Sequence, residues 1–298
     1  MQYNQLGKSF LKISEIGFGT MSLVSEEKSV KNILHKAMDY GINYFDTADL
    51  YDKGLNEIMI GKALKGKRDK IVLATKAGNQ WRPDGSGWDW NPKKKYILAC
   101  FEKSLQRLQT DYIDLFQLHG GTIDDPIDET IEAFEQLKQQ GKIRYYGISS
   151  IRPNVIREYV KRSSIISVMM QYSLLDRRPE EICLDFLQEN NIAVLPRGTL
   201  AQGLLVNKPA KEYLGYTTKE VAKAAAAIQS VSGEHRTAAQ TATRFAMQHP
   251  SVTSVIAGIR TMEQLEEIAN TINTPSLTAQ ELQTLQQSVP PKKYEMHR

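Results

Sequence analysis

Hydrophobic positions along the chain fall into two alternating patterns. Short, nearly continuous apolar runs recur eight times, and each is followed by a longer stretch whose apolar residues are three or four positions apart. The runs predict strands and the longer stretches predict helices, so we expect eight strand–helix pairs. The first helical stretch has Val30, Ile33, Leu34, Ala37 and Met38 on one face. The runs are EIGFGTM (15–21), INYFD (42–46), KIVLATK (70–76), YIDLFQLH (112–119), KIRYYGIS (142–149), IISVMMQY (165–172), IAVLP (192–196) and TSVIAG (253–258).

Nearly continuous apolar strands separated by helices are typical of a parallel sheet that is covered by helices on its outer face. Eight such units match a (β/α)₈ TIM barrel, which typically has ~250 residues. A doubly wound sheet is the alternative, but GFGTM lacks the spacing of the GxGxxG dinucleotide motif. We therefore expect a single barrel domain over residues 1–298. It would have an N-terminal hairpin (2–15), loop insertions at the barrel mouth (78–92 and 204–236) and a C-terminal tail (286–298).

Polar residues close three neighbouring runs. Asp46 ends INYFD, Lys76 ends KIVLATK, His119 ends YIDLFQLH, and Tyr51 follows five residues after Asp46. In such a barrel the active site lies at the carboxyl ends of strands, and neighbouring strands are roughly 4.8 Å apart. A buried carboxylate needs a partner. We therefore expect these four residues to share one region of the mouth, with Lys76 as the cation that pairs with Asp46.

Each of the four residues has an ordinary structural explanation by itself, but together they predict proton transfer to a carbonyl group. A phenol is a poor acid at neutral pH. An ammonium group beside Tyr51 would stabilise the phenolate, and Asp46 would hold that ammonium in place. Tyr51 would then protonate the carbonyl oxygen while His119 orients it. No side chain supplies the hydride, and QLHGG has no second His or Cys nearby that would indicate a metal site.

Composition and charge narrow the class of protein. Hydrophobic residues make up 41% and charged residues 24% of the 298 positions, which is ordinary for a globular protein. The net charge of +4 is spread along the chain, and the short basic clusters KGKRDK and PKKK are read as solvated helix ends rather than a nucleic-acid surface. Cys100 and Cys183 lack metal-ligand spacing and are read as buried hydrophobes. The chain has no secretory or membrane-spanning run, which favours a cytoplasmic location without membrane partners.

The sequence resembles the aldo-keto reductase family over essentially its whole length, most closely the bacterial branch related to potassium-channel β subunits. The resemblance rests on the order and spacing of eight segments. The catalytic tetrad of the family falls on Asp46, Tyr51, Lys76 and His119. The segments are LGKSFLKISEIGFGTM, YFDTADLYDKGLNEIMIGKAL, VLATKAG, YIDLFQLHG, GKIRYYGISS, MMQYSLLDR, LAQGLL and HPSVTSVIAGIRTMEQLEEI.

The resemblance implies a nicotinamide dinucleotide that lies across the barrel mouth without a Rossmann motif. Residues at the end of the first strand would approach the nicotinamide, Ser149 and Gln171 would bind its carboxamide, and the loop from Leu200 to Gly203 would pass over the pyrophosphate. At the adenosine end, Arg260 and helix-terminal amides suit a 2′-phosphate, which favours NADPH, with NADH also possible. The full expected set is Gly19, Thr20, Met21, Asp46, Ser149, Ser150, Gln171, Arg197, Gly198, Thr199, Leu200, Ala201, Gln202, Gly203, Gly258, Arg260, Gln264 and Glu267.

Three positions depart from the family pattern. The usual asparagine after Ser149 is Ser150, which shortens the reach to the carboxamide. Arg197 replaces the aromatic residue that commonly stacks on the nicotinamide, and a guanidinium plane can also stack on a ring. Ile268 replaces an asparagine near the adenine. These departures bear on cofactor affinity more than on catalysis.

The loop GNQWRPDGSGWDWNP (78–92) carries Trp81, Trp88 and Trp90. These rings would line the substrate pocket and favour a hydrophobic or aromatic carbonyl compound. The alternative is that some of these rings anchor the loop to the barrel. The alanine-rich segment 208–239 favours a helix, either as a lid with Lys208 near phosphate or as a surface addition. The tail would add Tyr294 or Met296 to the pocket rim, or would be disordered.

Two functions from different classes fit these observations. One is an NADPH-dependent carbonyl reductase with Tyr51 as the acid, and the other is a cofactor-sensing binding protein with vestigial turnover. The intact tetrad favours the enzyme, because a sensor would not require all four residues. A barrel enzyme for sugar phosphates is a weaker third reading, since VIAGIRT is better explained by the adenosine site. The sequence names neither the substrate nor the oligomeric state.

Overall fold

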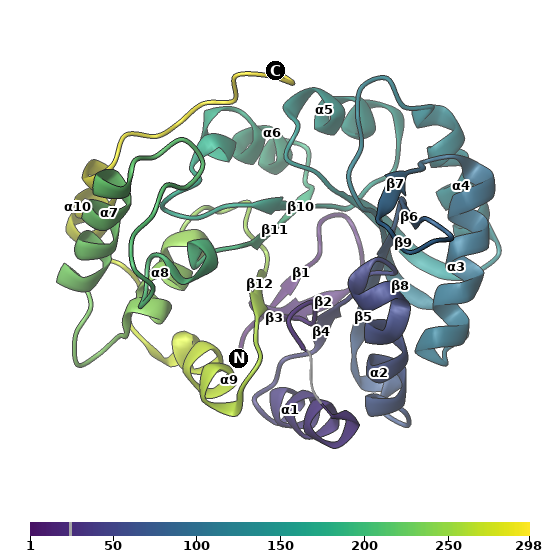
Figure 1. The fold of residues 1–298 in the computed structure, drawn as a ribbon, viewed down its shortest axis with the longest axis horizontal. Coiled ribbons are helices and arrows are strands. Elements are labelled where there is room, and N and C mark those ends of the chain that lie inside the picture. The colour runs from purple at the N-terminus through teal and green to yellow at the C-terminus, as the bar shows by residue number, and fades with distance from the viewer. Residues whose placement is uncertain (24–25) are drawn as a thin grey trace.

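The computed structural model describes residues 1–23 and 26–298 and contains a closed, parallel eight-stranded barrel surrounded by helices (Figure 1). The barrel strands follow the order β10–β11–β12–β3–β4–β5–β8–β9 around the ring. This confirms the predicted (β/α)₈ fold, and each of the eight apolar runs supplies one barrel strand. The barrel strands are β3 (Ile16–Gly19), β4 (Tyr44–Asp46), β5 (Val72–Ala77), β8 (Ile113–Leu118), β9 (Ile143–Ser149), β10 (Ser167–Gln171), β11 (Ala193–Arg197) and β12 (Val255–Gly258).

The helices begin and end where local chemistry favours it. A capping box between Thr217 and Glu220 starts one helix, and Gly141, with φ of 71°, follows the end of another. The α-helices are α1 (Glu27–Asp39), α2 (Leu55–Ala63), α3 (Lys94–Leu108), α4 (Ile127–Gln139), α5 (Pro153–Arg162), α6 (Cys183–Glu189), α7 (Thr218–Ser230), α8 (Ala238–Met247), α9 (Met262–Ala269) and α10 (Ala279–Ser288). Within the described ranges, none of them combines the length and apolar character that a membrane crossing requires.

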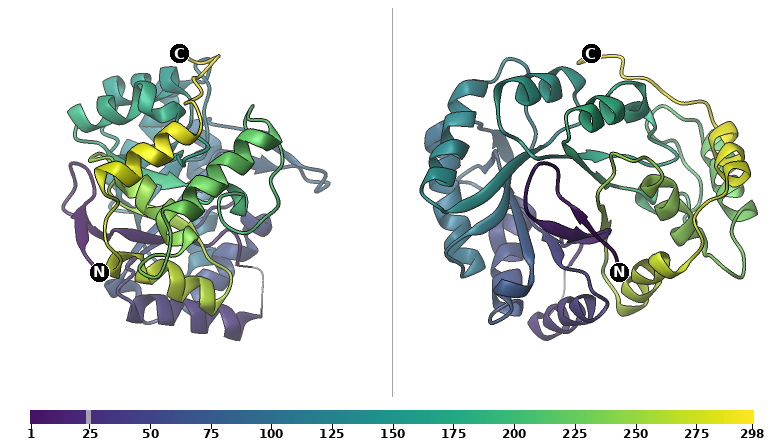
Figure 2. Two further views of the ribbon diagram at one scale, coloured as in Figure 1. Left: turned by 90° about the vertical axis from the view of Figure 1, so that its left-hand side faces the viewer. Right: turned by 180° about the vertical axis from the view of Figure 1, so that it is seen from behind.

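Two antiparallel hairpins project from opposite ends of the barrel (Figure 2). The N-terminal hairpin consists of β1 (Tyr3–Gln5) and β2 (Lys12–Ser14), as predicted, and it contributes Leu6, Leu11 and Ile13 to the core inside the barrel. The other hairpin consists of β6 (Asn79–Trp81) and β7 (Trp88–Trp90) and stands at the mouth. The segment 78–92, expected as a loop insertion, is therefore largely a hairpin, in which tryptophans alternate with polar residues.

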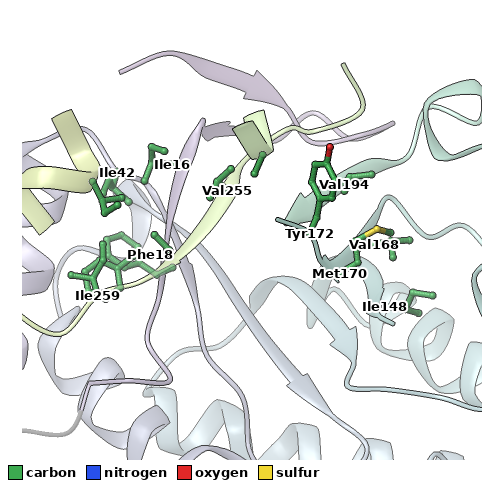
Figure 3. Close-up of a cluster of buried hydrophobic side chains, with 14 of the residues drawn as sticks. Ile16, Phe18, Ile42, Ile148, Val168, Met170, Tyr172, Val194, Val255 and Ile259 are labelled. Carbon is green, nitrogen blue, oxygen red and sulfur yellow. The ribbon is translucent and has the colours of Figure 1, made fainter. Parts of the chain in front are cut away.

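Side chains alternate across the barrel wall and form two hydrophobic clusters. On β10, Val168 and Met170 point outward into the large cluster under the helices, part of which Figure 3 shows, whereas Met169 belongs to the cluster inside the barrel. On β4 the same alternation turns Phe45 outward and Tyr44 inward. Asp46 follows Tyr44 by two positions, so it shares the inward face.

The C-terminal region differs from the expectation. Helix α10 extends to Ser288, so the irregular tail is shorter than the predicted 286–298. Tyr294 is buried, and its ring lies under the guanidinium of Arg178 at 5.0 Å, whereas Met296 is exposed. The carbonyl of His297 accepts a hydrogen bond from the backbone N–H of Asn154 at the start of α5 (2.9 Å). These contacts tie the tail to neighbouring helices.

Candidate active site

Strand register brings the polar strand ends into one interior layer. Asp46 pairs with Ala74 on β5, and Lys76 pairs with Gln117 on β8. Because inward positions alternate, Asp46, Lys76 and Gln117 all project into the barrel near its mouth. Each of the three is buried. Asp46 and Lys76 therefore converge as expected, and Gln117 from β8 joins them as a third side chain.

The ammonium of Lys76 uses all of its donors within this layer. Its Nζ atom forms an ion pair with Asp46 and donates to the carbonyl of Thr47 at 2.8 Å and to the Tyr51 hydroxyl at 3.2 Å. Burial alone lowers the pKa of Lys76, but the neighbouring Asp46 and Tyr51 outweigh it, so that the pKa is raised overall. The ammonium form is therefore favoured, and Lys76 is the partner of Asp46 that the sequence predicts.

Asp46 is held at both carboxylate oxygens. Lys76 contacts Oδ1, and the side-chain amide of Gln117 donates to Oδ2 at 3.1 Å. Burial raises the pKa of Asp46, while Lys76 and Gln117 oppose that shift because both contacts favour the ionised form. The contact with Gln117 was not anticipated. Its only sequence signal is the inward-facing position two residues before His119 on a strand that ends at the mouth.

A short segment after β4 places the Tyr51 hydroxyl. The backbone N–H of Asp49 donates to the carbonyl of Lys76 (3.2 Å), and the carboxylate of Asp49 accepts from the Cys100 thiol on α3 (2.9 Å). Asp52 and Lys53, in the 3-10 helix η1 (Tyr51–Gly54), have left-handed φ angles of 48° and 53°, which L-residues seldom adopt. The segment is thus tied to β5 and to α3 and turns sharply just beyond Tyr51.

The imidazole of His119 completes the group. Its ring meets the Tyr51 ring edge-on, with centroids 5.8 Å apart and an interplanar angle of 85°. Burial, together with the positive charges of Lys76 and Arg197, lowers the pKa of His119 to about 3. The imidazole is therefore neutral near neutral pH. Its Nδ1 atom is buried and has no hydrogen-bond partner among the residues that the structure describes.

Two of the three tryptophans in the mouth hairpin are anchored by their indole N–H groups. Trp81 donates to the carbonyl of Leu50 at 3.2 Å, and Trp90 donates to the carboxylate of Asp125 at 2.9 Å. Trp90 also lies against Gly78 and Gly120, where an added Cβ atom would come within 2.6 and 3.1 Å of its ring. Trp88 is 48% exposed. Trp81 is thus anchored at Leu50, next to Tyr51 in the chain, and Trp90 lies against Gly120, next to His119.

The residues expected to bind the nicotinamide half lie at neighbouring strand ends. Arg197 pairs in register with Gln171, and its guanidinium donates to the Gln171 side-chain oxygen at 3.3 Å. The Gln171 amide in turn donates to the Tyr213 hydroxyl at 3.0 Å. Thr20, just past the end of β3, is buried: its hydroxyl donates to the Asn56 side chain (2.7 Å), its backbone N–H donates to the carbonyl of Asp46 (2.9 Å), and its carbonyl accepts from the Asn56 amide (2.9 Å).

At the expected adenosine end, the residues lie around the start of α9. The Thr261 hydroxyl caps this helix, and the backbone N–H of Arg260 donates to the Gln264 side chain at 3.0 Å. Glu267 accepts a hydrogen bond from the Thr237 hydroxyl at 2.7 Å. Ile268 is buried, so no polar contact is available from that position. Gly258 pairs with Gly19 and joins this region to the end of β3.

The chain is similar over nearly its whole length to known oxidoreductases. The model of the Aldo/keto reductase family matches residues 15–290. "Uncharacterized oxidoreductase YqkF" of Bacillus subtilis is 50% identical over 307 residues, covering 100% of both chains. The holo form of aldo-keto reductase AKR11C1 from Bacillus halodurans is 50% identical, with a TM-score of 0.94 over 100% of this chain and 99% of that one. "Aldo-keto reductase yakc [NADP(+)]" of Schizosaccharomyces pombe is 34% identical over 203 residues, 65% of this chain and 60% of that protein.

Proposed function

Because the chain belongs to the aldo/keto reductase family of oxidoreductases, we propose that it reduces aldehydes or ketones to alcohols with NADPH, using Tyr51 as the general acid. The observation that carries this proposal is the Tyr51 hydroxyl at 3.2 Å from a buried ammonium whose other donors are taken by Asp46 and Thr47. A phenol held in this way is suited to give up its proton to an oxygen that gains negative charge.

His119 would act as a neutral hydrogen-bonding group rather than as a proton source. Its buried imidazole, with a pKa of about 3, stays uncharged over the working pH range. A neutral imidazole can donate one hydrogen bond to the carbonyl oxygen and so orient it toward Tyr51. Protonation of the oxygen is then left to Tyr51, which is the only member of the group with an O–H.

The cofactor proposal rests on the strand ends around Arg197 and Arg260. When bound, NADPH supplies the hydride that no side chain provides. Gln171 offers an amide for the carboxamide, and Arg197 offers a planar cation beside it. Arg260 is exposed at the capped start of α9, where a guanidinium and helix-terminal N–H groups suit a 2′-phosphate. The NADP(+) in the printed name of the fission-yeast relative agrees with this preference, and NADH is the second possibility.

The substrate would enter beside the β6–β7 hairpin. Trp81 and Trp90 are fixed by their N–H contacts, so their ring faces form a stable apolar wall near the Tyr51 and His119 strand ends. Trp88 lies opposite Trp81 in the hairpin but is more exposed, so it would contact only the larger substrates. This arrangement favours a carbonyl compound with a hydrophobic or aromatic group. A cofactor sensor with vestigial turnover is less favoured, because it would need none of the contacts that place Tyr51.

The test is fluorescence titration with NADPH and NADH, followed by aldehyde-dependent oxidation of the reduced cofactor. 4-Nitrobenzaldehyde and methylglyoxal serve as substrates, with Tyr51→Phe as the matched variant that keeps the ring and removes the hydroxyl. We expect tighter binding of NADPH than of NADH and turnover that Tyr51→Phe abolishes while cofactor binding is retained. Binding without turnover in the wild type would favour the sensor, and binding of neither dinucleotide would refute the proposed function.

A further inference from the structure

A fully buried glutamine lies beside the ion pair at the barrel mouth. Gln117 is on β8, in register with Lys76, and no part of its side chain reaches the surface. Its Nε2 atom donates to Asp46 Oδ2 at 3.1 Å, while Lys76 contacts Oδ1. The nitrogen must face the carboxylate, because the opposite amide orientation would place two acceptors against each other. Asp46 on β4 is thus held by side chains from two other strands, Lys76 from β5 and Gln117 from β8.

The hydrogen-bonding capacity of this amide is only partly used among the described residues. The Oε1 atom of Gln117 is buried and has no hydrogen-bond partner among the described residues, and the same holds for the Tyr44 hydroxyl. A buried acceptor without a partner destabilises a protein, whereas an apolar side chain of similar size would not. The neighbouring inward residue on β8 is Leu115, which packs in the interior cluster. The hydrogen bond to Asp46 is therefore the contact that favours a glutamine at this position, and the same amide also acts on the neighbouring Tyr44 hydroxyl.

We propose that Gln117 is a positioning residue of the reductase: its amide keeps Asp46 ionised and oriented so that the Lys76 ammonium faces the Tyr51 hydroxyl. This inference rests on the proposed function. Lys76 contacts Oδ1 of Asp46, so the amide of Gln117 gives Oδ2 its only side-chain hydrogen bond among the described residues. Without the amide, Oδ2 would lose that bond. The carboxylate would then be free to rotate or to take up a proton, and the ammonium would follow it away from Tyr51 or lose its counter-ion.

Other charged and titratable groups also act on this carboxylate, so the effect of the amide has to be separated from theirs. Those groups are Lys76 on β5, Arg197 on β11 and Tyr44 on β4 itself, while Tyr51, in the segment after β4, acts through Lys76 and Tyr44. Gln117→Met leaves these four side chains in place, because it removes only an uncharged donor.

The kinetic test compares Gln117→Met with the wild type. Methionine has a similar length and volume but cannot donate a hydrogen bond. We expect kcat to fall about 10- to 100-fold, which is the range for a lost hydrogen bond to a charged group, with little change in the KM values for NADPH and aldehyde. Ser167→Ala removes a buried hydroxyl that has no partner in the described part of the chain. Ser167 lies at the start of β10, at the end of the barrel away from the mouth, so this variant should retain kcat. An unchanged kcat in Gln117→Met, or an equal loss in Ser167→Ala, would overturn the inference.

A second variant gives a signature that a purely structural role would not produce. In Gln117→Glu, a protonated carboxyl can still donate to Asp46, whereas an ionised one repels it. We therefore expect kcat of Gln117→Glu to rise toward wild type as the pH is lowered. A pH dependence parallel to that of the wild type would contradict the proposed role.

An infrared titration tests the contact without turnover. The carbonyl stretch of protonated Asp46 is identified by its absence in Asp46→Asn. Removing the amide donor should make Asp46 take up its proton at a higher pH in Gln117→Met than in the wild type. An unchanged midpoint would overturn the inference whatever the activity. If the midpoint shifts but the wild type reduces no aldehyde, the proposed reaction fails while the contact between Gln117 and Asp46 stands.

Discussion

At the scale of single residues, the site places groups with opposite protonation preferences side by side. Lys76 keeps its proton because Asp46 and Tyr51 surround it, whereas His119 loses its proton because burial and two cations disfavour the imidazolium. Ordinary histidines change charge between pH 5 and 8, but this one does not. The chemistry expected of the site therefore has one acid, Tyr51, and one neutral orienting group.

This assignment predicts the pH dependence of His119 variants. His119→Asn, which keeps a neutral donor, should retain more activity than His119→Ala, and the alanine variant should lose about 100-fold or more in kcat, as for the loss of an oxyanion-stabilising donor. When kcat is measured against pH, the His119 imidazole should cause no change in the wild-type profile between pH 5 and 8. If the wild type shows a pH-dependent step in that range and both variants lack it, the imidazole titrates during turnover.

At the scale of elements, the segment between β4 and α2 depends on a buried carboxylate outside the tetrad. Asp49 accepts hydrogen bonds from Cys100 and Tyr96 on α3, and its Oδ1 atom has no partner among the described residues. Burial raises the pKa of Asp49 to about 6, more than the two hydrogen bonds lower it. The segment that places Tyr51 is thus fixed to α3 through the Asp49 carboxylate, whose ionisation destabilises the folded protein.

The raised pKa of Asp49 predicts a pH-dependent stability. The folded protein holds this proton up to about pH 6, whereas the unfolded chain releases it near 3.8. The contribution of Asp49 to the free energy of unfolding is therefore present below pH ~4 and falls by roughly 3 kcal/mol as the pH rises through 6. Asp49→Asn should lack this fall, so its unfolding free energy relative to the wild type should increase over that interval.

Urea unfolding between pH 4 and 8 measures this difference. Asp39→Asn is the matched control, because Asp39 is exposed near the end of α1 and should leave the pH dependence of the wild type intact. A constant difference between Asp49→Asn and the wild type at all pH values would show that Asp49 has an ordinary carboxyl titration.

At the scale of the whole molecule, chemistry and stability lie at different levels of the barrel. Asp114, near the start of β8, is buried and joins three strands. It accepts from the backbone N–H of Leu73 on β5 (2.9 Å) and pairs with Arg68 (2.6 Å) and with Arg144 on β9 (3.1 Å). Residues at the amino-terminal ends of barrel strands generally serve stability rather than catalysis.

Asp114 variants should therefore change stability without changing the reaction. Asp114→Ala leaves the buried Leu73 N–H without an acceptor and the partly buried Arg68 without its counter-ion, so the free energy of unfolding should fall by about 3 kcal/mol. The remaining hydrogen bonds of Arg68 go to Thr110, Ile71 and Tyr112. Arg144→Met is the control, because the Arg144 side chain is about half exposed and its loss should cost at most ~1 kcal/mol. The measurements are urea unfolding and kcat per folded molecule. A loss of kcat comparable to that of Tyr51→Phe would show that the two levels are coupled.

Much of the architecture was accessible from the chain itself. The eight apolar runs predicted the eight barrel strands, because burial on both faces of a parallel strand requires nearly continuous hydrophobic residues. Asp46, Lys76 and His119 could be selected because parallel strands bring their carboxyl ends together. The hairpin in 78–92 was missed because its strands have only three residues each, are partly exposed and are joined by a turn rich in Gly and Pro. The extent of α10 was missed because its apolar face is narrow, with Leu285 and Ser288 as the buried positions.

The sequence by itself determined the barrel, the order of its strands along the chain and the four polar residues at the mouth, because local periodicity and strand-end position are properties of neighbouring residues. Tertiary structure alone decided which contacts those residues make. Side chains from distant segments decide each of these contacts. They include the hydrogen bond from Gln117 to Asp46, the anchoring of Trp81 and Trp90, the burial of Tyr294 and the neutral state of His119. Their distances and burial arise only when the closed barrel sets the register between strands.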